Sequence, residues 1–449
     1  MNDSGQHHHA AILAHQLLQA GAAAEPTRTL KSLVAAAESA KEQQAFREAE
    51  KDYRHALLIL KELPETAERD ARELDLLMKV VPLVWTNQGF GGEQLQELNA
   101  RCRVLAERTG ELSSLINDAY ASWTTTIATG QYAACEGFAD ILIEIAKKEG
   151  SDLSLSLAYE AQLEVRTYRG DLLGSEEHFA SGNALFRLPG FQQITGAVDR
   201  VFFQASLNAW LLGFADTACQ RFVPSIGTAP QRSSFDHAHA KCNAGALSVL
   251  LREPEKAAVF AAQAVEISRV HGYPEIAAWS SAVLGWAKAQ LGAAREGVTL
   301  LRQYAKFARA TGQRIFVTAY LTWLAEAQGM CGSLVDALHT IEVALKTNRE
   351  KVFFQPETMR VRGELHLRQH ATRLAEEDFR QATAIAAKMK AKAWELRATT
   401  SLARLLRDTN RRDEARTMLA EIYNWFTEGF DTADLKDAKA LLEELKQRA

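Results

Sequence analysis

A small residue recurs about every 40 positions along this 449-residue chain. Residues four positions after it are usually large and apolar, as at Tyr53 and Phe379, and alanine often follows three positions later. Such a period predicts a chain of stacked units, because one unit of this length cannot bury its apolar face alone. The aligned positions, separated by 38 to 46 residues, are Ala49, Leu95, Cys135, Ser175, Ala218, Ala257, Gly297, Ala337, Ala375 and Ala415.

The small-then-large spacing is helical and lets two helices approach closely while a bulky side chain fills the groove between them. This is the logic of tetratricopeptide (TPR) repeats, here with units longer than the usual ~34 residues. Only 9 prolines and 26 glycines interrupt the chain. We therefore expect an all-α, right-handed, TPR-like superhelical solenoid of about ten helical hairpins with a C-terminal capping helix.

Glycines and prolines mark the expected ends of these helices. Second helices should end at glycine, which readily adopts the left-handed conformation of a helix C-terminus; the candidates are Gly110, Gly150, Gly272 and Gly312. Pro82 lies inside a helical pattern and should kink that helix. The other prolines, including Pro224 and Pro230, are expected in or beside breaks.

Three segments follow from the pattern. Residues 1–9 are polar and terminal, and we expect a disordered tail. Residues 10–431 form the repeat solenoid. In residues 432–449 the side chains of Leu435, Ala438, Leu442 and Leu445 share one helical face, which predicts the capping helix.

Residues 353–367, 394–408 and 420–445 resemble the C-terminal repeat region of bacterial STAND/AAA ATPase regulators. In that family an adenylate or guanylate cyclase domain, or a winged-helix DNA-binding domain, precedes the ATPase, and the repeats act as sensor or scaffold. The chain has no G-x-x-x-x-G-K-[ST] phosphate loop and no cyclase segment. The resemblance therefore implies a receiver module, with neither nucleotide hydrolysis nor cyclisation.

The composition limits the classes of partner and the compartment that we expect for this protein. The net charge of −4 gives no global attraction to nucleic acid or anionic lipid. No apolar run reaches the ~18 residues of a membrane span, and the start lacks the basic region of a signal peptide. The five cysteines lie far apart among small or apolar neighbours, as core residues of a reduced compartment do. We expect a cytoplasmic protein without a cofactor.

The sequence patterns that would indicate metal binding, phosphate binding or a catalytic nucleophile are weak. His366 and His370 stand four apart on an expected helix, but no third metal ligand follows from the spacing. Glycines in residues 89–92 indicate a loop between repeats, because no Lys-Ser/Thr follows them. No G-x-S-x-G elbow presents a nucleophile. We expect neither a metal site nor catalytic residues.

The residues most informative about function are those that the repeat register places on the inner face of the superhelix. Aromatic and arginine side chains there are typical anchors of recognition surfaces. We expect their rings to be partly exposed and contiguous across the curve. The candidates are Tyr120, Arg200, Phe203, Trp210, His239, Trp279, Trp286, Arg360, Arg397 and Arg404, accompanied by Glu160, Glu164, Glu364 and Arg407.

These features favour a non-catalytic interaction scaffold or regulatory sensor that binds a protein or peptide segment in its concave groove. One alternative is a sensor for a small apolar ligand, with a pocket near Phe203, Trp210, Trp279 and Trp286. Another is the regulatory part of a nucleotide cyclase or ATPase regulator that lacks its catalytic domains.

Overall fold

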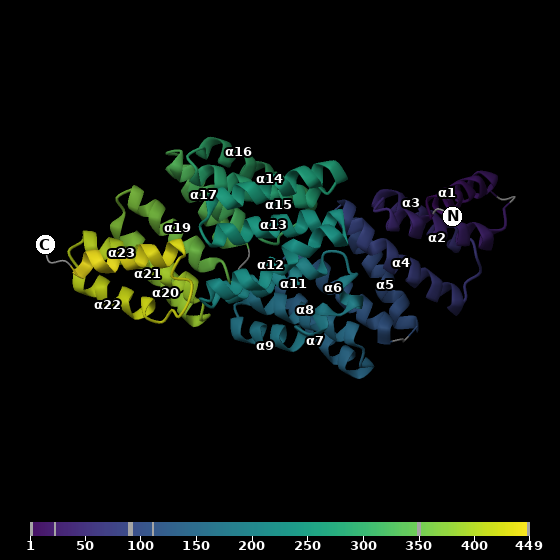
Figure 1. Cartoon of the computed structure of the whole chain (residues 1–449), viewed down its shortest axis with the longest axis horizontal. Coiled ribbons are helices and arrows are strands. Elements are labelled where there is room, and N and C mark those ends of the chain that lie inside the picture. Colours follow the sequence, from purple (N-terminus) through teal and green to yellow (C-terminus); the bar gives the residue numbers. More distant parts are fainter. Residues whose placement is uncertain (1–2, 22–23, 89–92, 110–111, 348–351, 447–449) are drawn as a thin grey trace.

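The computed structural model describes residues 3–21, 24–88, 93–109, 112–347 and 352–446. Within these ranges the chain forms α-helices joined by short turns and has no β-strand (Figure 1). The expected all-α class is confirmed.

The helices follow one another along the whole chain. The first group is α1 (Asp3–Ala20), α2 (Pro26–Glu42), α3 (Phe46–Lys61), α4 (Ala67–Gln88), α5 (Glu93–Thr109), α6 (Leu112–Ala128), α7 (Tyr132–Glu149) and α8 (Asp152–Arg169). The central group is α9 (Leu172–Gly182), the 3-10 turn η2 (Leu185–Arg187), α10 (Pro189–Gln192), α11 (Ala197–Leu211), α12 (Ala215–Arg232), α13 (Ser234–Leu250), α14 (Pro254–His271) and α15 (Pro274–Gln290). The last group is α16 (Ala294–Thr311), α17 (Val317–Met330), α18 (Leu334–Thr347), α19 (Gln355–Arg368), α20 (Thr372–Lys388), α21 (Lys392–Asp408), α22 (Arg412–Tyr423) and α23 (Ala433–Lys446).

Consecutive helices pack as antiparallel hairpins, from α2–α3 through α21–α22. Each aligned position of the 40-residue period falls in the first turn of the second helix of a hairpin, as Ala49 does in α3 and Ala415 in α22. Ala49 and Ala415 are fully buried against the first helix. The predicted repeat register is confirmed, and the first helices of successive hairpins form an inner layer.

Close helix approach explains why one aligned position is glycine. A Cβ atom at Gly297 in α16 would lie 2.5 Å from the carbonyl oxygen of Gly285 in α15. No side chain larger than hydrogen fits without moving a helix. Second helices α7, α14 and α16 end at glycines in the left-handed conformation, as predicted, while Gly110 lies outside the described residues.

Two prolines differ from the expectation. Pro224 and Pro230 lie inside α12, whereas the sequence analysis placed them in or beside breaks. Both are exposed, so water can bind the carbonyl groups that lose their helical hydrogen bonds. Pro82 lies inside α4 as expected.

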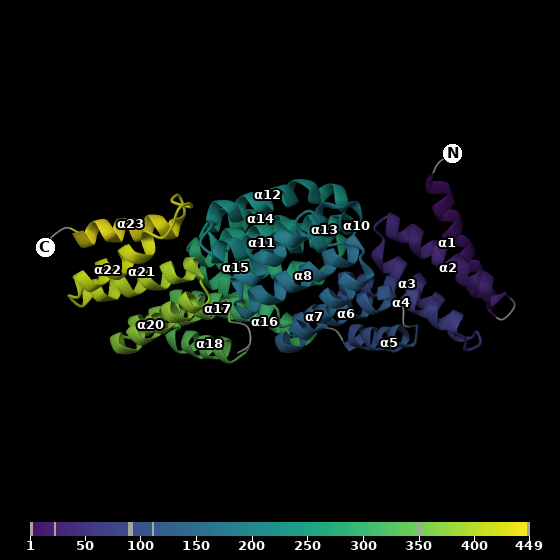
Figure 2. The same cartoon turned by 90° about the horizontal axis from the view of Figure 1, so that it is seen from below.

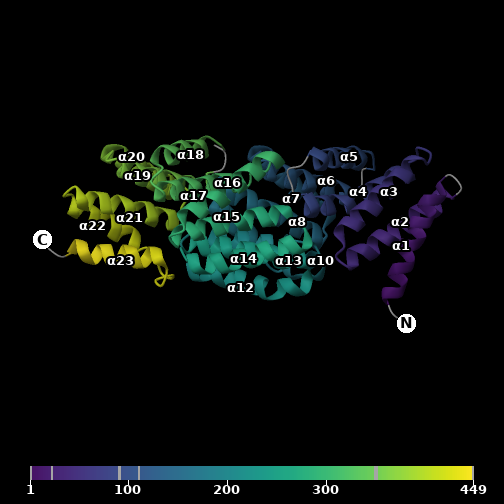
Figure 3. The same cartoon turned by 90° about the horizontal axis from the view of Figure 1, so that it is seen from above.

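Successive turns of the superhelix are in contact, so that repeats far apart in sequence touch, while the two termini lie at opposite ends of the molecule (Figures 2 and 3). The Ser234 hydroxyl donates to Gln44 Oε1 at 2.7 Å across 190 residues, and the backbone N–H of Thr217 donates to Glu428 across 211 residues. These separations equal about five repeats. Contacts between the turns leave an enclosed interior instead of an open groove.

The two ends of the chain differ from each other. Helix α23 packs on α21 and α22 and buries the predicted face of Leu435, Ala438, Leu442 and Leu445. Helix α1 begins at Asp3 and spans most of the stretch for which we expected a disordered tail. Residues 6–20 contain no proline or glycine that would stop a helix. Among the described helices, none is long and apolar enough to cross a membrane.

Candidate functional site

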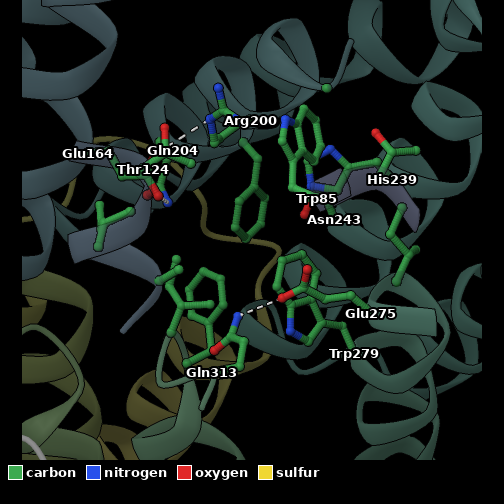
Figure 4. A pocket seen from close by; sticks show the side chains of 18 of the residues that line it. Trp85, Thr124, Glu164, Arg200, Gln204, His239, Asn243, Glu275, Trp279 and Gln313 are labelled. Carbon is green, nitrogen blue, oxygen red and sulfur yellow. Dashed lines mark hydrogen bonds and ion pairs between the residues drawn. The ribbon is translucent and has the colours of Figure 1, made fainter. Parts of the chain in front are cut away.

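The inner layer of helices lines two cavities, A and B, and a smaller one of about 40 Å³ adjoins both, sharing Trp279 with the first and Trp323 with the second. Cavity A, of about 60 Å³, lies between α4, α6, α8, α11, α13 and α15 and is closed by residues 313–316, which precede α17 (Figure 4). Cavity B, of about 310 Å³, lies between α13, α15, α17, α19, α21 and α23. The two share no lining residue.

A buried ion pair forms one wall of cavity A. Arg200 donates through Nε to Glu160 at 2.6 Å and through Nη2 to the Tyr120 hydroxyl at 2.6 Å. The Tyr120 hydroxyl in turn donates to Glu160 at 2.9 Å. Such a pair is stable in low dielectric only when further hydrogen bonds complete it, and Tyr120 supplies them here.

Two glutamines have their orientation fixed by carboxylates. Nε2 of Gln204 donates to Glu164 at 3.3 Å, and Nε2 of Gln313 donates to Glu275 at 3.1 Å (Figure 4). Because a carboxylate accepts only from the amide nitrogen, the amide oxygens must point elsewhere. Neither oxygen finds a hydrogen-bond partner within the described part of the chain. Leaving such a group unsatisfied costs about 1–3 kcal/mol.

Aromatic rings from repeats that are far apart in the sequence form the rest of the wall of cavity A. Trp85 packs edge-to-face on Phe235, with ring centres 5.3 Å apart. The ring centres of Phe316 and Phe203 lie 6.4 Å apart. Phe316 has φ = 59°, a left-handed backbone that a bulky residue rarely adopts. Strain of this kind persists only where the surrounding structure holds it, and here it keeps the ring in the wall.

His239 lies in the same wall, inside α13. Burial, with the nearby charges of Arg200 and Arg232, lowers the pKa of His239 to about 3. The imidazole is therefore neutral at physiological pH and adds no charge to cavity A.

Cavity B is lined by ion pairs. Arg397 donates to both carboxylate oxygens of Asp434, at 2.5 and 3.1 Å, and joins α21 to α23. Within α19, Arg360 binds both oxygens of Glu357 at 2.8 Å. Arg404 is nearer the surface and contacts Asp437 at 3.3 Å. Charges of both signs thus alternate around this cavity.

The pKa values in cavity B follow the pairing. Burial favours the neutral form of Asp434, but the guanidinium groups of Arg397 and Arg252 hold its pKa below the usual value. Burial raises the pKa of Glu326, and Arg360 nearby only partly opposes this shift. The carboxyl group of Glu326 therefore gains a proton at higher pH than an unperturbed glutamate.

The inner-face candidates from the sequence divide between the cavities. Arg200, Phe203, His239 and Trp279 line cavity A, and Tyr120 lies behind it. Trp286, Arg360, Arg397 and Arg404 line cavity B.

The expectation of partly exposed rings was wrong. Phe203, Trp210, Trp279 and Trp286 are only 3–8% exposed. Successive superhelical turns touch, so the inner face is closed where an open groove was expected. Trp210 packs on Trp394 of α21, between the turns.

Sequence reasoning missed several lining residues. In cavity A these include Trp85 and the two glutamines; in cavity B they include Glu326 and the aspartates of α23. One signal could have found the glutamines, because Gln204 and Gln313 bond carboxylates 40 and 38 residues earlier, one repeat away.

The weaker candidates stay apart from both cavities. Nδ1 of His366 lies 2.9 Å from Asp378, and His370 lies beyond the end of α19, so the two imidazoles do not share a helix. Within the described residues, no group of three metal-ligating side chains comes together. Residues 89–92, expected to form a loop, lie outside the described residues.

Known structures match the fold of most of the chain. No family model matches the sequence, and no curated protein matches it significantly. A Rap protein complexed with competence and sporulation factor matches with a TM-score of 0.55 and 13% identity, over 85% of this chain and 100% of that one. Cut9 in the APC/C hetero-tetramer Cut9–Hcn1 matches with a TM-score of 0.53 and 12% identity, over 93% and 76%. The chain has a TPR-like superhelical fold.

Proposed function

We propose that this TPR-like protein is a non-catalytic regulatory scaffold that binds a segment of a partner protein in cavity B. The observation that carries the proposal is the lining of this cavity, which combines Trp286, Trp323 and Trp394 with charges of both signs. Its volume of about 310 Å³ lies at the low end of the ~300–1,000 Å³ typical of ligand pockets, so it holds a few side chains of a segment and leaves the rest of the segment outside.

The lining suits a peptide segment. Tryptophan and arginine dominate binding energy in protein interfaces, and both occur here. The side chains of Arg252 and Arg404 are 41% and 43% exposed at the rim, where an incoming segment would meet them first. Ion pairs such as Arg360 with Glu357 hold the deeper wall in place, which reduces the ordering cost of binding.

A recognition role accords with the state of the charged groups. The carboxylates and guanidinium groups described above bond one another and present no nucleophile with an adjacent base. The likeness to a Rap protein solved with a bound factor supports partner binding by this fold.

The finer context rests on the sequence. The resemblance of residues 353–367, 394–408 and 420–445 to the repeat region of STAND/AAA regulators favours a receiver module for such an ATPase. The buried thiols of Cys102, Cys135 and Cys242 favour a reducing, cytoplasmic location.

The proposal is tested by selecting displayed peptides that bind the full-length chain and then measuring their affinity by calorimetric titration. We expect Arg404→Gln to weaken binding of a selected peptide about threefold to tenfold, because it removes a charge that attracts the incoming segment at the rim. Arg373→Gln is the matched control, since Arg373 lies on α20 with its side chain 79% exposed. Equal affinity of wild type and both variants would contradict binding in cavity B.

A further inference from the structure

Cavity A has a chemistry of its own that the binding of a partner segment in cavity B does not use. Its lining is almost wholly buried, with Trp123, Gln204 and Gln313 each 1–2% exposed. A protein segment cannot reach it while the superhelix is closed. Any occupant must therefore be small.

The size of the cavity limits the ligand. A water-sized group needs ~15 Å³ of such space, so about 60 Å³ has room for about four of them. A ligand of about four or five covalently linked non-hydrogen atoms is therefore the upper limit for this wall, because bonded atoms overlap and each needs less space than a separate water.

The charges around the cavity favour a cation. The carboxylates of Glu164 and Glu275 and the guanidinium of Arg200 line it. Arg200 pairs with Glu160 and also lies 3.8 Å from Glu164, so three carboxylates stand against one guanidinium. His239 is neutral. An anion would meet two carboxylates, whereas a cation would be attracted by both.

The hydrogen-bonding groups favour a donor. The amide oxygens of Gln204 and Gln313 are acceptors that find no partner in the described part of the protein. The indole N–H groups of Trp123 and Trp279 also line the cavity without a partner there, but these two donors face four acceptor groups, the two amide oxygens and the two carboxylates. An ammonium group offers up to three donors to such a set.

The aromatic wall favours the same class. Four aromatic side chains line the cavity from three segments: Trp85 on α4, Phe235 on α13, and Tyr273 and Trp279 just before and within α15. Aromatic faces attract organic cations through the ring quadrupole, most strongly where water is excluded.

We propose that cavity A binds a small protonated organic amine, held by Glu164, Glu275 and the two glutamine oxygens within the aromatic wall. This site is independent of the proposed function, because the two cavities share no lining residue. The ligand enters when residues 313–316 move away from α6, to which Arg314 N–H is bonded at the Ala128 carbonyl (2.7 Å).

The test compares three probes of nearly equal size on the full chain: n-butylammonium, 1-butanol and butyrate. Tryptophan fluorescence reports occupancy, because three tryptophans line the cavity, and thermal unfolding reports stabilisation. We expect n-butylammonium to bind at least about tenfold more tightly than 1-butanol and butyrate not to bind.

A variant localises the effect. Glu275→Gln keeps the shape and removes one charge, and it should weaken n-butylammonium binding about tenfold while leaving selected-peptide binding unchanged. A lysine-containing peptide should not compete, because its ammonium is attached to a chain too large for the cavity.

Three results would overturn the proposal, and each comes from the wild-type chain. Equal binding of n-butylammonium and 1-butanol would show a purely apolar cavity. Tighter binding of butyrate would show an anion site. No response to any probe would show that water alone satisfies the two glutamine oxygens.

Discussion

Trp210 of α11 packs edge-to-face on Trp394 of α21, with ring centres 4.6 Å apart, although five repeats separate them. The guanidinium of Arg397 lies over both rings, at 5.3 and 4.9 Å. This cluster joins two turns of the superhelix and turns an open groove into an enclosed interior.

Trp210→Ala should therefore act on folding. A buried tryptophan truncated to alanine typically costs about 3–5 kcal/mol, and this one also loses its contact with Arg397. Urea unfolding of wild type and variant measures the loss. Trp425→Ala is the control, because Trp425 is 39% exposed and should cost clearly less. Similar losses for the two variants would argue against a closed superhelix.

Two aspartates of α23 should behave differently. Asp434 lies between Arg397, whose side chain is only 11% exposed, and the rim residue Arg252. Asp434→Asn removes the carboxylate from the largely buried Arg397 guanidinium and should cost about 3–5 kcal/mol. The side chain of Asp437 is 38% exposed, and Asp437→Asn should cost about 0–1 kcal/mol. Urea unfolding measures which of the two variants is less stable, and the rate of proteolysis in the α22–α23 connection reports whether α23 has detached. The reverse order would show that Asp434 does not hold α23.

Stability should fall with acid partly because of His239. Its pKa is about 3 in the folded chain and 6.5 when unperturbed, so below pH 6.5 the unfolded chain binds a proton that the folded chain does not. Stability is lost as pH falls from 6.5 towards 3, at up to about 1.4 kcal/mol per pH unit. His239→Gln should remove about 2 kcal/mol of the loss between pH 7 and pH 5. Identical pH profiles of the two proteins in urea unfolding would refute the burial of a neutral imidazole.

Two glycine-to-alanine substitutions should change the free energy of unfolding in opposite directions. Gly297→Ala places a methyl group 2.5 Å from a carbonyl oxygen of α15 and should cost about 1–3 kcal/mol. Gly227→Ala, inside α12, meets nothing within 4 Å and should stabilise by about 0.5–1 kcal/mol through helix propensity. Thermal unfolding compares the two. Stabilisation by both would mean that α15 and α16 are not in close contact.

The repeat register could be predicted from the sequence, because small residues must recur wherever two helices pack closely. Ala49 to Ala415 all fell in second helices, and the packing face of α23 was also predicted from spacing alone. Inner-face positions such as Arg200 and Trp279 were predicted for the same reason, because the register fixes which side of a helix faces inward.

The closure of the superhelix could not be predicted from the sequence. It depends on the small rotation between repeats, summed over five of them, and no local pattern reports that sum. The contacts of Trp210 with Trp394 and of Arg397 with Asp434 arise from this sum or from the fold of the C-terminal end. Residues that the register placed on an open surface therefore became buried walls.

The binding of a partner segment inside the superhelix is tested most directly by photo-crosslinking a selected peptide to the full chain. A photoreactive amino acid at position 404 stands at the rim of cavity B, and the same residue at position 373 stands on the exposed side of α20. The account predicts peptide adducts from position 404 and none from position 373. Adducts from position 373 alone would place the partner on the outer surface and contradict the proposed function.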